Sequence, residues 1–144
     1  MDWKLELVVV PVTDVDRAKR FYSEQVGFAV DHDTRVSDDV HIVQLTPPGS
    51  ACSIAIATGM VKTPPGSVEG LQLVVPDIEA ARIQLAERGV AVSQVQHYEG
   101  ATRVEGPGGR WNSFIFFSDP DGNAWAVQER PTTTNGTGPQ NPLL

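Results

Sequence analysis

The chain has 144 residues, enough for one domain with a full core, and a net charge of −7. That charge argues against a nucleic-acid-binding surface, and no apolar run approaches the roughly 18 residues of a membrane span. The first eleven residues lack the features of a signal peptide, and the one cysteine, Cys52, allows no internal disulfide. We therefore expect a soluble cytoplasmic protein without nucleic-acid or membrane partners.

The first half of the chain predicts a strand, an amphipathic helix and three further strands. An apolar run ends at Val12, and the helix is predicted over 14–26 with Thr13 or Asp14 as its N-cap. Apolar residues recur at helical spacing and form its buried face: Val15, Ala18, Phe21, Tyr22 and Val26. The three strands are predicted near 28–34, 40–46 and 51–57.

The second half repeats this order after a linker rich in proline and glycine. A helix is predicted over 77–88, ending before Gly89, and strands near 91–97, 112–118 and 124–129. The segment from Glu99 to Arg110 contains four glycines and is predicted as a loop or a hairpin. As a lid over a binding site, this loop would bring Arg103 and Arg110 to an anionic ligand.

The two halves match each other at a spacing of 63 residues, although few positions are identical. Asp14 pairs with Asp77, and Ala18 pairs with Ala81. The repeat predicts an α+β fold built from two βαβββ modules. The predicted boundaries are 1–57 for the first module, 58–68 for the linker, 69–130 for the second module and 131–144 for a flexible tail.

This duplication resembles the vicinal oxygen chelate superfamily, which includes glyoxalase I, bleomycin-resistance proteins and extradiol dioxygenases. The resemblance rests on the stretch from Val12 to Tyr22 and on the DPDGN turn at 119–123. It implies a curved, eight-stranded mixed sheet around a cavity, with the helices on the outer face. It also implies a homodimer. The superfamily includes both metal-dependent enzymes and metal-free binding proteins, so the resemblance leaves the activity open.

In the metal-dependent members, four strands each place a His, Glu or Gln side chain in the cavity. Three of the matching positions here hold Leu7, Gly70 and Ala126, which have no donor atoms in their side chains. Direct alignment therefore predicts no cofactor. The alternative is a divalent metal ion held by the nearby donors Glu6, Gln72 and Glu129. Because side chains alternate along a strand, Gln72 shares a face with Gly70, whereas Glu6 and Glu129 fall on the opposite face.

The same alternation predicts a cavity face of mostly small residues, which leaves room for a small organic molecule. Trp111 lies next to the predicted lid, where it would stack on a ligand or cover the cavity mouth. The candidate ligand-binding residues are Leu7, Ser53, Ala55, Gln72, Val74, Trp111, Ala126 and Gln128.

The leading hypothesis is a metal-free protein that binds a small molecule. A first alternative is a metal-dependent lyase, isomerase or dioxygenase with displaced ligands, and a metal-free catalyst is another form of enzyme. A third hypothesis is a subunit or partner-binding module whose cavity is filled. His32, His41 and His97 are acid–base candidates, but no partner is spaced to define a catalytic triad. The catalytic residues therefore stay unassigned.

Overall fold

The computed structural model describes residues 1–132, so the predicted tail lies outside the described residues apart from its first two positions. By their internal contacts the residues form two compact units. The first unit is Met1–Glu69 with Ser118–Ala124, and the second is Gly70–Phe117 with the chain from Trp125 on. The DPDGN turn therefore belongs to the first unit, although the strands on either side of it belong mainly to the second.

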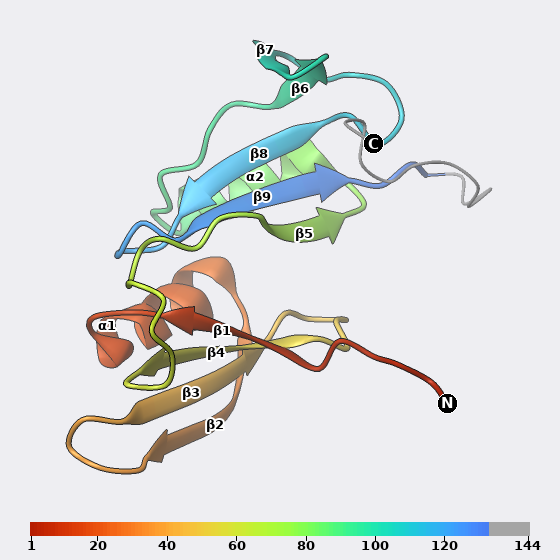
Figure 1. Cartoon of the computed structure of the whole chain (residues 1–144). Coiled ribbons are helices and arrows are strands. Elements are labelled where there is room, and N and C mark those ends of the chain that lie inside the picture. The colour runs from red at the N-terminus through yellow and green to blue at the C-terminus, as the bar shows by residue number, and fades with distance from the viewer. Residues whose placement is uncertain (133–144) are drawn as a thin grey trace. The chain divides into compact units, whose positions relative to one another are not determined.

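Each unit contains one βαβββ module, which confirms the predicted α+β fold (Figure 1). The first unit contains β1 (Leu7–Pro11), α1 (Val15–Arg20), the π-helix η1 (Phe21–Val26), β2 (Ala29–Arg35), β3 (His41–Thr46) and β4 (Ser53–Thr58). The second unit contains β5 (Leu71–Val75), α2 (Ile78–Glu87), β6 (Gln96–Glu99), β7 (Thr102–Glu105), β8 (Phe114–Ser118) and β9 (Ala124–Glu129).

The first sheet has the strand order β1-β4-β3-β2, and the second has the order β5-β9-β8-β6-β7. β1 runs parallel to β4, and β5 runs parallel to β9, so the repeat in the sequence is also a repeat in the strand pairing. Both sheets are open, which is consistent with the predicted curved sheet.

The prediction of eight strands is one too few, because β7 pairs with β6 in a tight hairpin. Glu99 lies opposite Thr102, and the two-residue loop between them begins with Gly100 at φ +61°. Glycine at this place is typical of a hairpin turn whose twist matches the two strands. The four glycines of this segment masked the strand signal of β7 in the sequence. Of the two predictions for 99–110, a loop or a hairpin, the structure has the hairpin.

The predicted strand over 91–97 was also wrong in its bounds, since β6 begins only at Gln96. Before Gln96, hydrogen bonds between Ser93 and β8 take the place of regular strand pairing. Its N–H donates to the Phe116 carbonyl at 3.0 Å, and its hydroxyl accepts from the Phe116 N–H at 3.0 Å. A side-chain oxygen thus takes the place of a backbone carbonyl beside β8.

The first helix covers the predicted length, but its second half is a π-helix. Asp14 is the N-cap, and its carboxylate accepts from the Arg17 N–H at 3.0 Å. Gly27 ends the helix at φ +93°, where its N–H donates to the Tyr22 carbonyl five residues back. The helix α1 packs against β3 and β4, and the residues beneath it include the fully buried Val43.

The DPDGN turn ties distant parts of the first unit together. Asp121 accepts from the Thr13 hydroxyl at 2.6 Å, and the Asn123 amide donates to the Pro11 carbonyl at 3.0 Å. The linker also packs on the turn, since a Cβ on Gly66 would lie 2.1 Å from the Asp121 carbonyl oxygen. Only glycine allows this approach.

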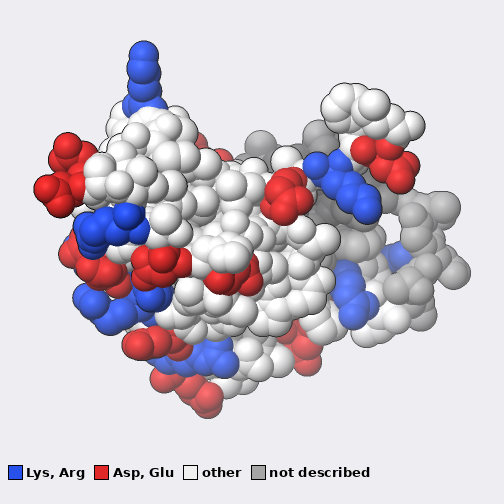
Figure 2. Space-filling model, turned by 90° about the horizontal axis from the view of Figure 1, so that it is seen from below, with Lys and Arg blue, Asp and Glu red and all other residues white. Residues whose placement is uncertain are grey.

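Charges of both signs are mixed on the face that Figure 2 draws, where acidic and basic side chains lie next to one another. Such a surface differs from the basic stripe that nucleic acids attract. Within residues 1–132 no helix is long and apolar enough to cross a membrane.

Candidate functional site

The second unit has a hollow of about 410 Å³ on the face of β5 and β9. We call it the Trp111 hollow, and it is lined by Gln72, Leu73, Val74, Trp111, Gln128 and Arg130. Four of these residues were predicted from the sequence as ligand-binding: Gln72, Val74, Trp111 and Gln128. Ala126, a fifth candidate, lies directly opposite Gln72 in the strand register.

Strand alternation explains how these side chains come together. Gln72 and Val74 are exposed on one side of β5, and their register partners on β9 are Ala126 and Gln128. The intervening β9 residue, Val127, is 2 % exposed and belongs to the core. The small Ala126 lies opposite Gln72 on the neighbouring strand, two residues before Gln128.

Gln128 is the polar centre of the Trp111 hollow, and it is 2 % exposed. Its Oε1 accepts from Gln72 Nε2 at 2.9 Å, and its Nε2 donates to the Trp111 carbonyl at 2.8 Å. The two bonds use both ends of the amide and fix its orientation. Gln128 thereby holds the loop that carries Trp111.

Trp111 has a backbone φ of +60°, a conformation that bulky residues rarely adopt. Such strain costs about 1–3 kcal/mol and persists only where surrounding contacts enforce it. The Gln128 bond to its carbonyl is one such contact. The result is a half-buried indole held at the edge of the hollow.

The other three candidates, Leu7, Ser53 and Ala55, lie in the first unit. Leu7 is 37 % exposed and pairs with Ser53, whereas Ser53 and Ala55 are buried. The Ser53 hydroxyl bonds to the Thr46 hydroxyl at 2.6 Å, and Thr46 also donates to the Asp31 carboxylate.

Gln44 completes this polar cluster on β3, with its amide 3.5 Å from the Ser53 hydroxyl. Gln44 and Thr46 were not predicted from the sequence as site residues. The signal was present, because His41, Val43 and Leu45 alternate with them and point to the other face of β3.

None of the three histidines is among the residues that line the Trp111 hollow. His32 is exposed on β2. His41 is buried, and its Nε2 donates to Asp33 at 2.7 Å. The pKa of the Asp33 carboxyl lies below its ordinary value of 3.8, first because Lys19 donates to it at 2.7 Å and second because His41 does.

His97 lies on the β6–β7 hairpin, where its Nδ1 donates to the Gly106 carbonyl at 2.7 Å. This bond, together with Glu99 nearby, raises the pKa of His97 above its ordinary value of 6.5. Arg103 also lies on this hairpin, and its guanidinium stacks on the Phe116 ring at 3.6 Å. Of the two arginines predicted on the lid, Arg103 is thus engaged within the hairpin.

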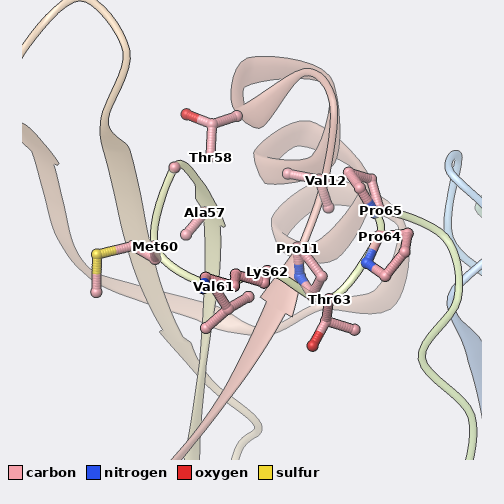
Figure 3. A pocket seen from close by; sticks show the side chains of 11 residues that line it. Pro11, Val12, Ala57, Thr58, Met60, Val61, Lys62, Thr63, Pro64 and Pro65 are labelled. Atoms are coloured by element: carbon pink, nitrogen blue, oxygen red, sulfur yellow. The ribbon is translucent and has the colours of Figure 1, made fainter.

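A separate hollow of about 320 Å³ lies in the first unit, at the end of β4 and the start of the linker (Figure 3). Its walls are mainly apolar, with Lys62 as the one charged side chain in its lining. Figure 3 shows Met60 directed away from Pro11 and Val12. From the sequence, residues 58–68 were predicted only as a linker.

The family model of the Glyoxalase/Bleomycin resistance protein/Dioxygenase superfamily matches residues 4–127. The chain belongs to this superfamily. No curated protein sequence matches the chain.

Solved structures of superfamily members are similar to the chain over most of its length. TnmS3, an antibiotic binding protein from Streptomyces sp. CB03234, is 34 % identical, with a TM-score of 0.72 over 90 % of this chain and 97 % of that one. A glyoxalase/bleomycin resistance protein from the same strain is 35 % identical, with a TM-score of 0.69 over 87 % and 99 %. A member from Sphaerobacter thermophilus DSM 20745 is 26 % identical, with a TM-score of 0.71 over 90 % and 98 %.

Many superfamily members use a metal, and within residues 1–132 the three alternative ligands predicted from the sequence have settings that do not fit one. Glu129 uses its carboxylate to accept from the Ile78 N–H at 2.8 Å, at the start of α2. The Gln72 amide donates to Gln128, and Glu6 is exposed in the first unit. Across the described part of the chain, no three His, Cys, Asp or Glu side chains gather as metal ligands would.

Proposed function

We propose that the chain binds a small organic molecule non-covalently in the Trp111 hollow, and that it does so without a divalent metal. The ligand class that we infer is an antibiotic or a similar natural product, since the chain resembles an antibiotic binding protein at 34 % identity over nine-tenths of its length. The protein would act by holding the molecule, and not by changing it.

The observation that carries this proposal is the pair of hydrogen bonds that links Gln72 through Gln128 to Trp111. The buried Gln128 accepts from Gln72 and donates to the carbonyl of Trp111, whose backbone is strained. These contacts hold the Trp111 indole at the edge of the hollow. An aromatic side chain with apolar neighbours and a few fixed amide groups is typical of a small-molecule site. The volume, about 410 Å³, lies within the range of such sites.

The first test is a fluorescence titration of the purified chain with N-phenyl-1-naphthylamine, a neutral aromatic probe. We expect saturable binding that Trp111→Ala weakens at least about tenfold, because the probe loses its stacking surface. Met60→Ala is the matched control, since it removes a large apolar side chain from the hollow of the first unit. If Met60→Ala weakens binding and Trp111→Ala does not, the ligand occupies the other hollow and this assignment is wrong.

The second test concerns metal and chemistry. Dialysis against a chelator should leave the probe affinity unchanged, and an aromatic antibiotic that displaces the probe should be recovered with its mass unaltered. A tightly held stoichiometric metal ion on which binding depends would overturn the metal-free proposal. A changed mass would show an enzyme instead.

We further propose that the protein is a homodimer and works in the cytoplasm. Trp3, Leu5 and Leu7 are 87 %, 71 % and 37 % exposed beside the edge strand β1, and a second copy would cover them. Sedimentation should show a dimer that Leu5→Ser weakens, and a monomer at micromolar concentration would refute it. Fractionation of producing cells checks the location.

A further inference from the structure

A second hollow of about 490 Å³ adjoins the Trp111 hollow within the second unit, since Trp111 and Arg130 line both. Arg110 lies in its wall as well, directly before Trp111 in the chain. Two arginines therefore share the lining of this second hollow with Trp111. A flat molecule stacked on the indole would place a substituent within reach of both cations.

Neither guanidinium is neutralised by the part of the chain that the structure describes. Arg110 and Arg130 are exposed, and none of the ion pairs among residues 1–132 includes either of them. Arg82 and Arg17, in contrast, each pair with a carboxylate. The positive charge at this border is thus available to a ligand.

Two acidic residues in the same hollow are already engaged at the start of α2. Asp77 accepts from the Ala80 N–H at 3.0 Å, and Glu129 accepts from the Ile78 N–H at 2.8 Å. The N-terminus of a helix carries about half an elementary positive charge, which offsets part of the charge of these two carboxylates. Both carboxylates thus accept from the backbone at the start of α2, whereas the two arginines line the hollow without an ion pair within residues 1–132.

Gly109 opens the wall between the arginines and the solvent. A Cβ built on Gly109 meets nothing within 4 Å, whereas one on the neighbouring Gly108 would lie 2.3 Å from the Asn112 carbonyl oxygen. Gly108 is required by the packing of the loop, and Gly109 leaves space beside Arg110. A ligand group can approach the backbone there.

We propose that the ligand of the Trp111 hollow carries an anionic group, a carboxylate, sulfonate or phosphate, which Arg110 and Arg130 bind in the adjoining hollow. This inference rests on the proposed function, because it assigns a charge to the same ligand. The two guanidiniums select an anionic aromatic molecule over a neutral one of the same shape. Arginine suits this role, since its planar fork donates two parallel hydrogen bonds to such groups.

The test compares two probes with the same aromatic frame: 1-anilinonaphthalene-8-sulfonate, which is an anion, and N-phenyl-1-naphthylamine, which is neutral. Arg110→Gln should weaken the sulfonate about tenfold, because a charge-assisted hydrogen bond is lost, and should change the neutral probe less than about twofold. Arg130→Gln should lower the preference for the sulfonate in the same direction. Arg20→Gln, an exposed arginine of α1, is the matched control and should alter neither affinity.

The outcomes separate the two proposals. If the neutral probe binds, Trp111→Ala weakens it, and the two arginine variants leave the sulfonate affinity unchanged, the anion site is wrong and the proposed function stands. If neither probe binds the unaltered chain, both fail. Circular dichroism of each variant, with the spectrum expected to match that of the unaltered chain, confirms that the substitutions leave the fold intact.

Discussion

Replacing Asp119 with asparagine should destabilise the protein by about 3 kcal/mol, because this buried carboxylate accepts five hydrogen bonds. Its Oδ1 accepts from the backbone N–H groups of Asp121, Gly122 and Asn123, at 2.9–3.0 Å. Its Oδ2 accepts from the Tyr22 hydroxyl and the Asn123 amide, both at 2.8 Å. The turn and the first helix are thus joined through one side chain.

The magnitude follows from what asparagine can and cannot accept. Its one oxygen can still serve the three backbone donors, but its NH₂ group then faces Tyr22 and the Asn123 amide. The Tyr22 hydroxyl can rotate and accept, whereas one N–H of the Asn123 amide is left without an acceptor, while the other still donates to the Pro11 carbonyl. A buried unpaired donor costs about 1–3 kcal/mol, and the loss of the charge weakens the remaining bonds. A total of about 3 kcal/mol corresponds to a fall in Tm of about 10 °C in a chain of this size.

Urea unfolding of the two proteins, followed by tryptophan fluorescence and far-UV circular dichroism, measures the difference. Asp38→Asn is the matched control: the same chemical change at an exposed position, with an expected effect within about 0.5 kcal/mol. Tyr22→Phe removes one of the five bonds and should cost about 1 kcal/mol. If the free energy of unfolding of Asp119→Asn stays within about 1 kcal/mol of that of the unaltered chain, the hydrogen bonds of Asp119 do not stabilise the link between the turn and the first helix.

Three further predictions concern the other polar contacts. Glu129→Ala should cost about 1 kcal/mol in urea unfolding, because Ile78 loses its acceptor at the start of α2; an unchanged midpoint would contradict that role. Asp33 has a lowered pKa because of Lys19, so its contribution to the free energy of unfolding is present above pH 3.8 and is lost as the pH falls through the folded pKa. Asp33→Asn should remove that part of the acid dependence, which is worth less than about 1 kcal/mol for this exposed pair. His97 should titrate above 6.5 by NMR, so its contribution is present below that pH and is lost as the pH rises through the folded pKa; a midpoint at or below 6.5 would refute the assigned cause.

Much of the fold could be predicted from the sequence because its signals are local. Asp14 and Asp77 cap the two helices, Gly27 stops the first, and apolar alternation marks the strands. The order βαβββ then follows twice from the spacing of 63. These features depend on neighbours within a few residues, so a single sequence contains them.

What could not be predicted depends on which side chain meets which. The shift from α1 to a π-helix requires the Gly27 N–H to bond five residues back, and β6 starts late because Ser93 bonds to β8. Strand alternation assigns a side chain to one face of the sheet, but it does not identify the residue that this side chain contacts. The importance of Arg130 was missed for this reason, since it follows the last strand and its neighbours come from β5 and the Trp111 loop.

The candidate site shows the same division between face and partner. Alternation placed Gln72, Ala126 and Gln128 on one face of the second unit, and the structure has them there. It did not show that the two glutamine amides bind each other and that Gln128 also holds the Trp111 carbonyl. That choice of partners is what turns a face of small residues into a candidate site with a fixed aromatic wall.

These partners also bear on why a carboxylate at position 126 would not by itself restore a metal site. Ala126 lies beside Gln72, whose Nε2 donates to the Gln128 Oε1. The positions that the resemblance assigns to two other ligands hold Leu7 and Gly70, which offer no donor side chain. A single new acid would meet amides that already bond to each other and would carry an unpaired charge. A carboxylate at position 126 would therefore lie beside Gln72 without a side-chain ligand from position 7 or position 70.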